Sequence, residues 1–136
     1  MKKLALLIVL MFLFSLAACT GSELQSFTEL REAFVARGEG VVGYEVDEIE
    51  EYEGVKFFAV RVCLNTDDAV TVDDYIWFEA NVMYFEDSAE ADAAYQQNQA
   101  TGLGGTCIRK GNILMYWLTG DEFADLYQEV FTNVLG

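Results

Sequence analysis

Residues 75–86 read YIWFEANVMYFE, and this stretch is the clearest β-strand in the chain. Successive side chains of a strand point to opposite faces. One face of this strand is therefore entirely apolar and carries Ile76, Phe78, Ala80, Val82 and Tyr84. The opposite face carries Met83, Phe85 and a pair of aromatic residues, Tyr75 and Trp77, and is interrupted by Glu79 and Asn81. Two interpretations fit this second face: helices cover it, or it holds a small aromatic binding surface around Tyr75 and Trp77.

The sequence before this strand predicts a helix and two further strands. Ser26-Phe27-Thr28-Glu29 matches a capping box, in which a serine caps the helix and a glutamate follows three residues later. Apolar residues then recur at helical spacing, and Gly38 and Gly40 end the predicted helix. The stretches 42–46 and 55–64 have the composition and alternation of strands, with an acidic connection at 48–54 between them.

The sequence after the strand predicts a second helix and a hairpin. Asp87 begins this helix, whose narrow apolar edge consists of Ala91, Ala94 and Tyr95. Residues 106–110 and 113–118 then predict a hairpin around Gly111-Asn112. We expect three apolar residues of the hairpin to extend the face of Trp77, namely Ile113, Met115 and Trp117.

A third helix is predicted at the C-terminal end. Thr119-Gly120-Asp121-Glu122 matches another capping box, and the apolar residues from Phe123 to Leu135 follow the strongest helical pattern in the chain. The order of elements predicts an α+β fold, a single small domain with a mainly antiparallel sheet of about five strands and three helices. We expect the helices to lie on one face of the sheet.

The composition excludes several classes of function. The chain of 136 residues contains no histidine, which rules out histidine-based catalytic triads and the usual zinc sites. Its formal net charge of -15 opposes binding to nucleic acid and to anionic lipid. Nucleic acid is therefore not expected among its partners.

The first residues match a secretory signal peptide. Lys2 and Lys3 form a basic start, and an apolar run with small residues at its end leads to Cys19. The apolar stretch 4–18 is shorter than the roughly 20 residues that a membrane-spanning helix needs. We therefore predict that residues 1–18 are a cleaved leader.

Leu16-Ala17-Ala18-Cys19 resembles the lipobox of bacterial lipoproteins. The resemblance implies that Cys19 becomes the lipidated first residue, held by its acyl chains in the cell membrane or the outer membrane on the extracytoplasmic side. Residues 19–25 are then a lipidated N-terminus with a short linker, and residues 26–136 an acidic folded domain. The alternative is a secreted protein whose Cys19 carries no lipid.

The mature chain predicted in this way is strongly acidic. All 23 acidic residues and all basic residues except Lys2 and Lys3 follow residue 18, so residues 19–136 carry a formal charge of about −17. Repulsion from anionic headgroups favours a domain that faces outward from the membrane.

Cys63 and Cys107 are the cysteines that remain after Cys19. Two cysteines in an exported chain are typical of a disulfide, and we predict one between them. The alternative is a pair of separate buried thiols, because free cysteine is common in protein cores.

Carboxylates dominate the segment from Glu45 to Glu53 and the pairs Asp67-Asp68 and Asp73-Asp74. Such oxygen ligands suit Ca²⁺, but the EF-hand spacing is missing, so we favour a solvated acidic surface and predict no cofactor. Paired carboxylates also act as acid and base in glycoside cleavage. Our main prediction is a lipid-anchored, non-enzymatic binding or accessory protein whose partner is a protein or an envelope ligand. The alternative is a surface hydrolase that uses carboxylates or a bound divalent metal.

Overall fold

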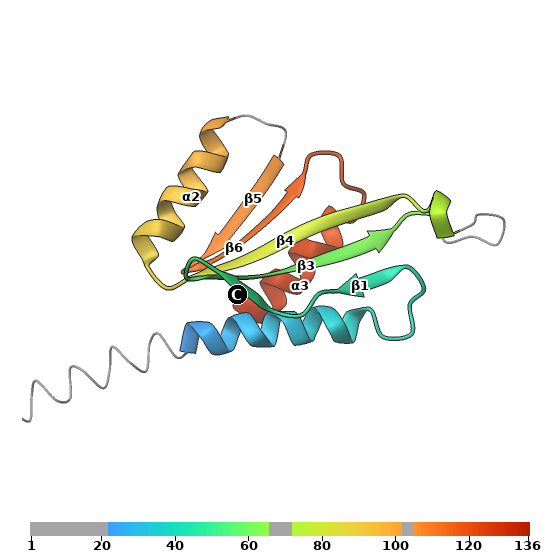
Figure 1. The fold of residues 1–136 in the computed structure, drawn as a ribbon, viewed down its shortest axis with the longest axis horizontal. Helices are drawn as coiled ribbons and strands as arrows, with labels where there is room; N and C mark the ends of the chain where they lie inside the picture. Colours follow the sequence, from blue (N-terminus) through green and yellow to red (C-terminus); the bar gives the residue numbers. More distant parts are fainter. Residues whose placement is uncertain (1–21, 66–71, 102–104) are drawn as a thin grey trace, which may run out of the picture.

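The computed structural model describes residues 22–65, 72–101 and 105–136, which form an α+β domain around one antiparallel sheet (Figure 1). The strands in this part of the chain are β1 (Tyr44–Val46), β2 (Glu50–Tyr52), β3 (Val55–Cys63), β4 (Trp77–Phe85), β5 (Gly105–Lys110) and β6 (Ile113–Leu118). Five strands follow the spatial order β1-β3-β4-β6-β5, and β2 pairs with β3. The helices of this part are residues 22–37, α2 (Ser88–Thr101) and α3 (Ala124–Leu135), with a short 3-10 helix, η1 (Val72–Asp74), before β4.

Strand β2 lies in the acidic segment that we predicted to be a connection. It pairs with the start of β3, so that Glu50 lies opposite Phe57 and Tyr52 lies opposite Val55. The turn between the two strands, Glu53-Gly54, has a positive φ at both positions, 49° and 80°. Two-residue hairpin turns of this hand match the twist of their strands. The pairing therefore depends on the turn and on the neighbouring strand, since acidic side chains have a low strand propensity.

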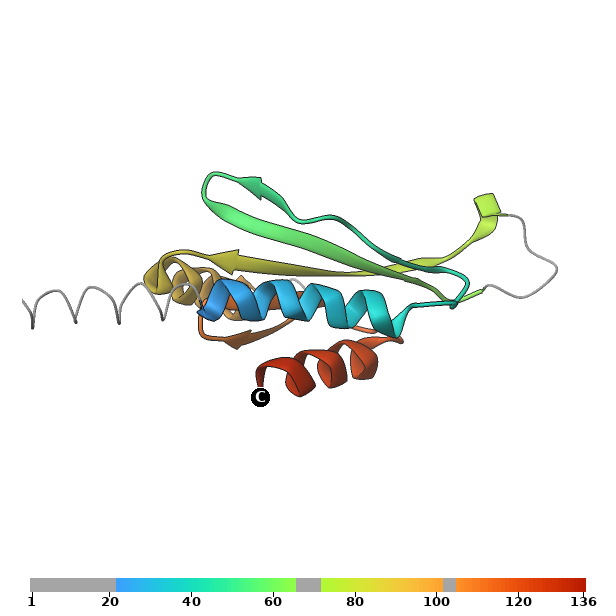
Figure 2. The ribbon, with the colours of Figure 1, turned by 90° about the horizontal axis from the view of Figure 1, so that it is seen from below.

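The main core lies between one face of the sheet and two helices, residues 22–37 and α3. Figure 2 shows these helices side by side, and an ion pair of 3.7 Å between Arg37 and Glu129 joins them. Phe27, Phe34 and Tyr127 are completely buried between the helices and the strands. All members of this core lie between Leu24 and Leu135, so residues 19–136 contain the whole core of the described domain.

The helix α2 lies on the opposite face of the sheet, which corrects our expectation that the helices share one face. Ala91 is completely buried and packs against Cys107 of β5 and Leu114 of β6. The predicted apolar edge of α2 is therefore confirmed. It covers the strands β5 and β6 and the end of β4, where Met83 and Phe85 pack against it. In the described part of the chain no helix lies over the rest of this face, formed by β3 and the start of β4, which we call the open face (Figure 1).

The capping box predicted at Ser26 does not form. Residues 22–25 are already helical, and the Ser26 hydroxyl donates a hydrogen bond of 3.0 Å to the Ser22 carbonyl. Such a bond to the preceding turn places Ser26 inside the helix. The predicted linker at 19–25 therefore overlaps the helix from residue 22.

The capping box predicted at Thr119 is also wrong, whereas the start predicted for α2 is confirmed. The helix α3 begins at Ala124, and the Asp121 carboxylate accepts a hydrogen bond of 2.8 Å from the Phe123 backbone. At α2, the Asp87 carboxylate accepts a hydrogen bond of 2.8 Å from the Ala89 backbone, as expected of an N-cap.

Candidate functional site

The open face brings together the two aromatic residues that the sequence analysis singled out. The rings of Tyr75 and Trp77 meet edge to face with centroids 6.2 Å apart, and Trp77 is 37% exposed. Trp77 begins β4 and Tyr75 lies two residues before it, whereas α2 covers the other end of the strand. Partly exposed aromatic side chains are frequent anchors of binding surfaces. The pair thus shares one surface, and binding at that surface stays a prediction.

Two hollows at the open face have Asn81 and Tyr116 in common among their lining residues, and we call the two together the open-face groove. The larger hollow has a volume of about 620 Å³ and is lined by Tyr52, Glu53, Val55, Phe57, Asn81, Met83, Glu90 and Tyr116. The smaller hollow has a volume of about 480 Å³ and is lined by Trp77, Phe78, Glu79, Asn81, Tyr116, Leu118, Thr119, Gly120 and Asp121. Volumes in this range accommodate ligands, so the groove can take up several side chains of a partner.

Tyr116 is a central residue of this groove that the sequence analysis missed. The expectation that Ile113, Met115 and Trp117 extend the face of Trp77 is wrong, because all three are buried in the main core. The alternate residue Tyr116 lies opposite Asn81 of β4 and packs at the margin of the part that α2 covers, so it borders the open face. A shift of one residue in register exchanges the two faces of a strand, and only the pairing with β4 decides between them.

Gly105 allows the Tyr116 ring to lie across β5. A Cβ atom at position 105 would come within 2.1 Å of the ring. Because real Cβ atoms do not approach other atoms so closely, any larger residue at position 105 would displace the ring. Gly105 therefore leaves the space that the Tyr116 ring, which lines both hollows, occupies.

A charged cluster reaches the smaller hollow through Glu79, which lines it. Arg61 forms ion pairs with Asp47, with Glu79 at 3.2 Å and with Glu45 at 3.5 Å. Glu45 and Glu79 lie opposite Arg61 on the two neighbouring strands, so the antiparallel register brings the three side chains together. The hydrogen bond that the guanidinium donates to Asp47 raises the pKa of Arg61. One cation faces several carboxylates, which leaves the cluster with a negative net charge.

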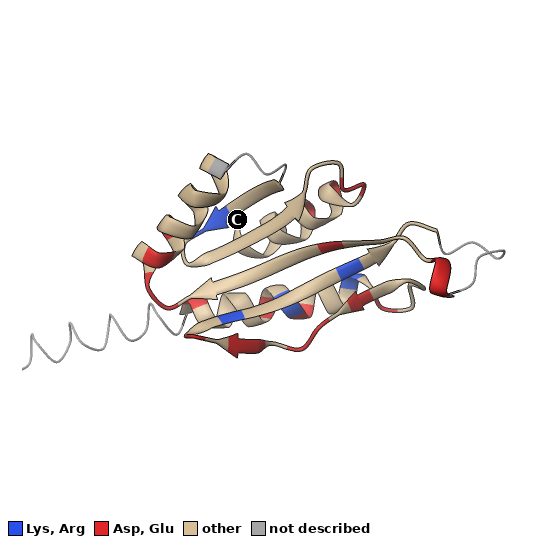
Figure 3. Cartoon of the chain, turned by 45° about the horizontal axis from the view of Figure 1, so that its top comes forward, with Lys and Arg blue, Asp and Glu red and all other residues tan. Residues whose placement is uncertain are grey.

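Further carboxylates lie at the border of the groove. Glu53 and Glu90 line the larger hollow, and Glu79 lines the smaller one. Figure 3 shows acidic positions along β1, β2 and the connection between them, and again at the start of α2. The open-face groove therefore combines an apolar floor with an acidic border.

The acidic segment from Glu45 to Glu53 is divided among several ion pairs instead of forming one cluster. Besides the contacts to Arg61, Glu48 pairs with Arg31 at 3.2 Å and Glu51 pairs with Lys56 at 2.8 Å. Among the residues that the structure describes, no three acidic or cysteine side chains are close enough to hold a metal ion. The segment therefore contributes ion pairs to both faces of the sheet.

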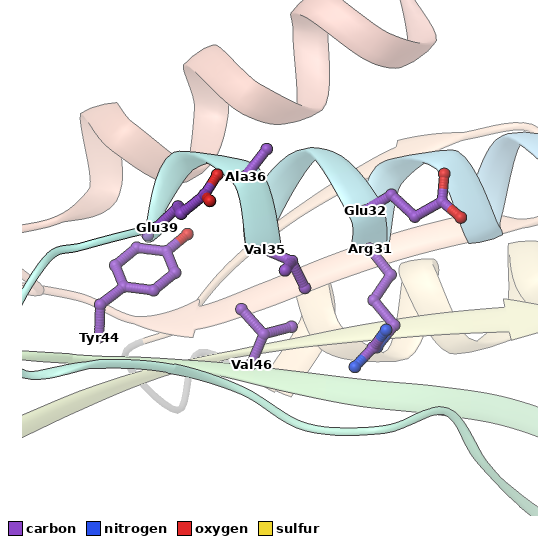
Figure 4. A pocket seen from close by; sticks show the side chains of 8 residues that line it. Arg31, Glu32, Val35, Ala36, Glu39, Tyr44 and Val46 are labelled. Atoms are coloured by element: carbon purple, nitrogen blue, oxygen red, sulfur yellow. The ribbon is translucent and has the colours of Figure 1, made fainter.

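A second groove lies between the helix 22–37 and the edge strand β1 (Figure 4). Its volume is about 620 Å³, and it is lined by Arg31, Glu32, Val35, Ala36, Gly38, Glu39, Tyr44 and Val46. Arg31 is held by a hydrogen bond of 2.7 Å to the Asp47 carbonyl, and the Tyr44 ring lies so close to Gly38 that a Cβ there would be 1.9 Å away. The lining side chains therefore hold the helix against the sheet, and we regard the open-face groove as the candidate site.

The predicted disulfide between Cys63 and Cys107 does not form, and both cysteines are buried and free. Cys63 belongs to β3 and Cys107 to β5, and the strands β4 and β6 lie between them. With strands spaced by about 4.8 Å, the three spacings across the sheet alone place the two residues at least about 14 Å apart, twice the Cα distance of about 7 Å that a disulfide tolerates. The alternative of two separate thiols therefore holds. Burial raises the pKa of Cys107 to about 11, which keeps this thiol protonated.

No family model, curated protein or solved structure matches the chain. The predicted leader at 1–18, the lipidation site Cys19 and the pair Asp67-Asp68 lie outside the described residues. Among the helices that the structure describes, none has the length and apolar character needed to cross a membrane. The candidate site thus depends on the geometry of the open face alone.

Proposed function

We propose that the protein is an exported, lipid-anchored binding protein without an enzymatic role, and that its open-face groove holds a protein or an envelope ligand. The observation that carries the binding role is the uncovered part of the sheet face. There a groove with an apolar floor meets Trp77, which is 37% exposed. Uncovered apolar surface of this kind is typical of interaction sites in small soluble domains.

The proposed anchor rests on the resemblance of residues 16–19 to a lipobox. Residue 22 already belongs to a helix, so Thr20 and Gly21 alone separate Cys19 from the described domain. Three extended residues span about 10 Å, which would keep the domain next to the membrane. The strand β4 begins at the end of the molecule that is remote from residue 22 (Figure 1), so Trp77 would stand away from the lipid surface.

The anchor is tested by the variant Cys19→Ala. We expect this variant to leave the membrane fraction and to incorporate no labelled fatty acid, because the thiol that receives the lipid is gone. Cys63→Ala is the control and should remain in the membrane fraction. Mass spectrometry of the wild-type protein that finds Cys19 unmodified would exclude the anchor.

The binding role is tested by cross-linking in cells that produce the protein. A photoreactive phenylalanine analogue at Trp77 should form covalent adducts with a neighbouring molecule, because this side chain borders the groove. The same analogue at Gln128, an exposed position of α3, is the control. Identical adducts from both positions, or none from position 77, would contradict a binding role of the open face.

A further inference from the structure

We propose that the occupant of the open-face groove is a cationic segment of a partner protein that carries both basic and apolar side chains. This inference rests on the proposed binding function and adds the chemical class of the partner. Its basis is the combination of an apolar floor and an acidic border at one groove.

The floor of the larger hollow selects for apolar groups. Phe57 and Met83 lie opposite each other on adjacent strands, and Val55 extends this surface along β3. Tyr52 also lines this hollow and exposes 69% of its surface, so a ligand can contact its side chain. Contact with apolar side chains of a partner would remove this surface from water, which is favourable.

The border of the groove selects for positive charge. The side chains of Glu45, Asp47 and Glu79 remain 59%, 42% and 45% exposed beside Arg61, so their carboxylates are accessible to a second cation. Glu53 and Glu90 line the larger hollow. A basic side chain that reaches this border while its neighbours contact the floor would meet a carboxylate at either hollow.

The same charge disfavours other occupants. A second copy of the chain would bring two acidic borders together, because each mature chain carries about −17. Anionic lipid surfaces and nucleic acids are repelled in the same way. A basic protein segment is the occupant that complements both the floor and the border.

The inference is tested with three synthetic peptides of about ten residues that carry a neutral fluorophore. One alternates lysine with leucine, one alternates glutamate with leucine, and one alternates lysine with serine. Residues 19–136 with Cys19→Ala, which contain the whole described core, are titrated into each peptide, and binding is followed by fluorescence anisotropy. We expect the lysine–leucine peptide to bind at least about tenfold more tightly than either of the others, because it alone complements both floor and border.

Two pairs of substitutions localise the binding. Glu79→Gln combined with Glu90→Gln should weaken binding of the lysine–leucine peptide about threefold to tenfold, because both carboxylates line the groove. The control combines Glu29→Gln with Glu129→Gln, two exposed positions on the helices of the opposite face, and changes the net charge of the protein by the same amount. This control should change the affinity for the peptide by less than about twofold. Each double variant breaks one ion pair. The groove variant breaks the pair between Glu79 and Arg61, and the control breaks the pair between Glu129 and Arg37.

Several results would overturn the inference. Equal binding of the lysine–leucine and glutamate–leucine peptides, an equal loss in both double variants, or no binding of any peptide would each exclude a cationic occupant in this groove. If adducts still form from position 77 in cells, the proposed binding function survives such a failure. If the lysine–leucine peptide binds as expected but no adducts form in cells, the proposed function fails instead.

Discussion

At the scale of single residues, two glycines determine where aromatic rings lie. A Cβ atom would come within 2.1 Å of the Tyr116 ring at Gly105 and within 1.9 Å of the Tyr44 ring at Gly38. Both glycines are needed for space, because neither has the positive φ that would favour glycine for its conformation. Gly38 thereby lets β1 approach the end of the first helix, and Gly105 sets the position of a ring that both hollows of the open-face groove share.

Tyr44 allows the effect of burial on stability to be measured. Burial raises its pKa from 10.0 to about 12, against a smaller opposing effect of Arg37. The folded state therefore holds the phenol proton more tightly than the unfolded chain. The contribution of this group to stability is complete below about pH 10 and is lost as the pH rises toward 12.

We expect Tyr44→Phe to make the free energy of unfolding fall less steeply between about pH 10 and pH 12. Some slope should remain, because burial also raises the pKa values of Tyr84 and Tyr127. Urea denaturation across this pH range measures the effect, and Tyr52→Phe at a 69% exposed position is the control. An unchanged slope in Tyr44→Phe would contradict the assigned burial effect.

Cys63 and Cys107 provide a second prediction at this scale. In residues 19–136 with Cys19→Ala, thiol titration in denaturant without reductant should find both thiols free, because two strands separate the cysteines. In the native protein Cys107 should react slowly, since it is buried and its pKa is raised to about 11. A reducing agent should leave the melting temperature unchanged, and a protein without free thiols would contradict the strand order.

At the scale of elements, the small residues of α2 determine how closely it packs on the sheet. Ala91 is completely buried against Cys107 and Leu114, whereas Ala93 of the same helix is exposed. Ala91→Leu should destabilise the fold by about 1–3 kcal/mol, because the added atoms have no space between helix and strands. Chemical denaturation measures the difference, and Ala93→Leu is the matched control, with a change of less than about 0.5 kcal/mol. Equal stability of the two variants would contradict the docking of α2 through Ala91.

Local patterns were sufficient to predict most of the elements. The alternation in 55–64 and 75–86, the turn at Gly111-Asn112 and the helical spacing after Phe123 each depend on neighbours in the sequence, and each prediction is confirmed. The acidic strand β2 depends on its partner strand. The two wrong capping boxes show that a four-residue pattern does not determine where a helix begins when packing extends or shortens it.

At the scale of the whole molecule, the candidate site was predictable only in part. Alternation along one strand placed Tyr75 and Trp77 on a common face, and the structure confirms this placement. The contribution of Tyr116 depends on how β6 pairs with β4, and the separation of the cysteines depends on the order of the strands. Both are long-range properties of the sheet that no local pattern encodes.

The excess of negative charge is also a property of the whole molecule, and it leads to the last prediction. Ion pairs in the described residues engage Arg31, Arg37, Lys56, Arg61 and Arg109, so the basic side chains are largely occupied while many carboxylates remain in excess. Exposed ion pairs contribute only about 0–1 kcal/mol each, and repulsion within a chain of about −17 acts over the whole surface.

Added salt should therefore stabilise this protein, although salt weakens its ion pairs. Raising the NaCl concentration from about 10 mM to about 100 mM shortens the Debye length from about 30 Å to about 10 Å, which screens the long-range repulsion. We expect the melting temperature of residues 19–136 with Cys19→Ala to rise over this range. A triple variant at exposed positions should have a higher melting temperature at low salt, because it removes part of the repulsion; it combines Glu32→Gln, Glu39→Gln and Glu122→Gln. The melting temperature of this variant should also depend less on the NaCl concentration. A melting temperature that falls with NaCl would mean that the ion pairs around Arg61, and not the excess charge, dominate the electrostatic free energy of folding.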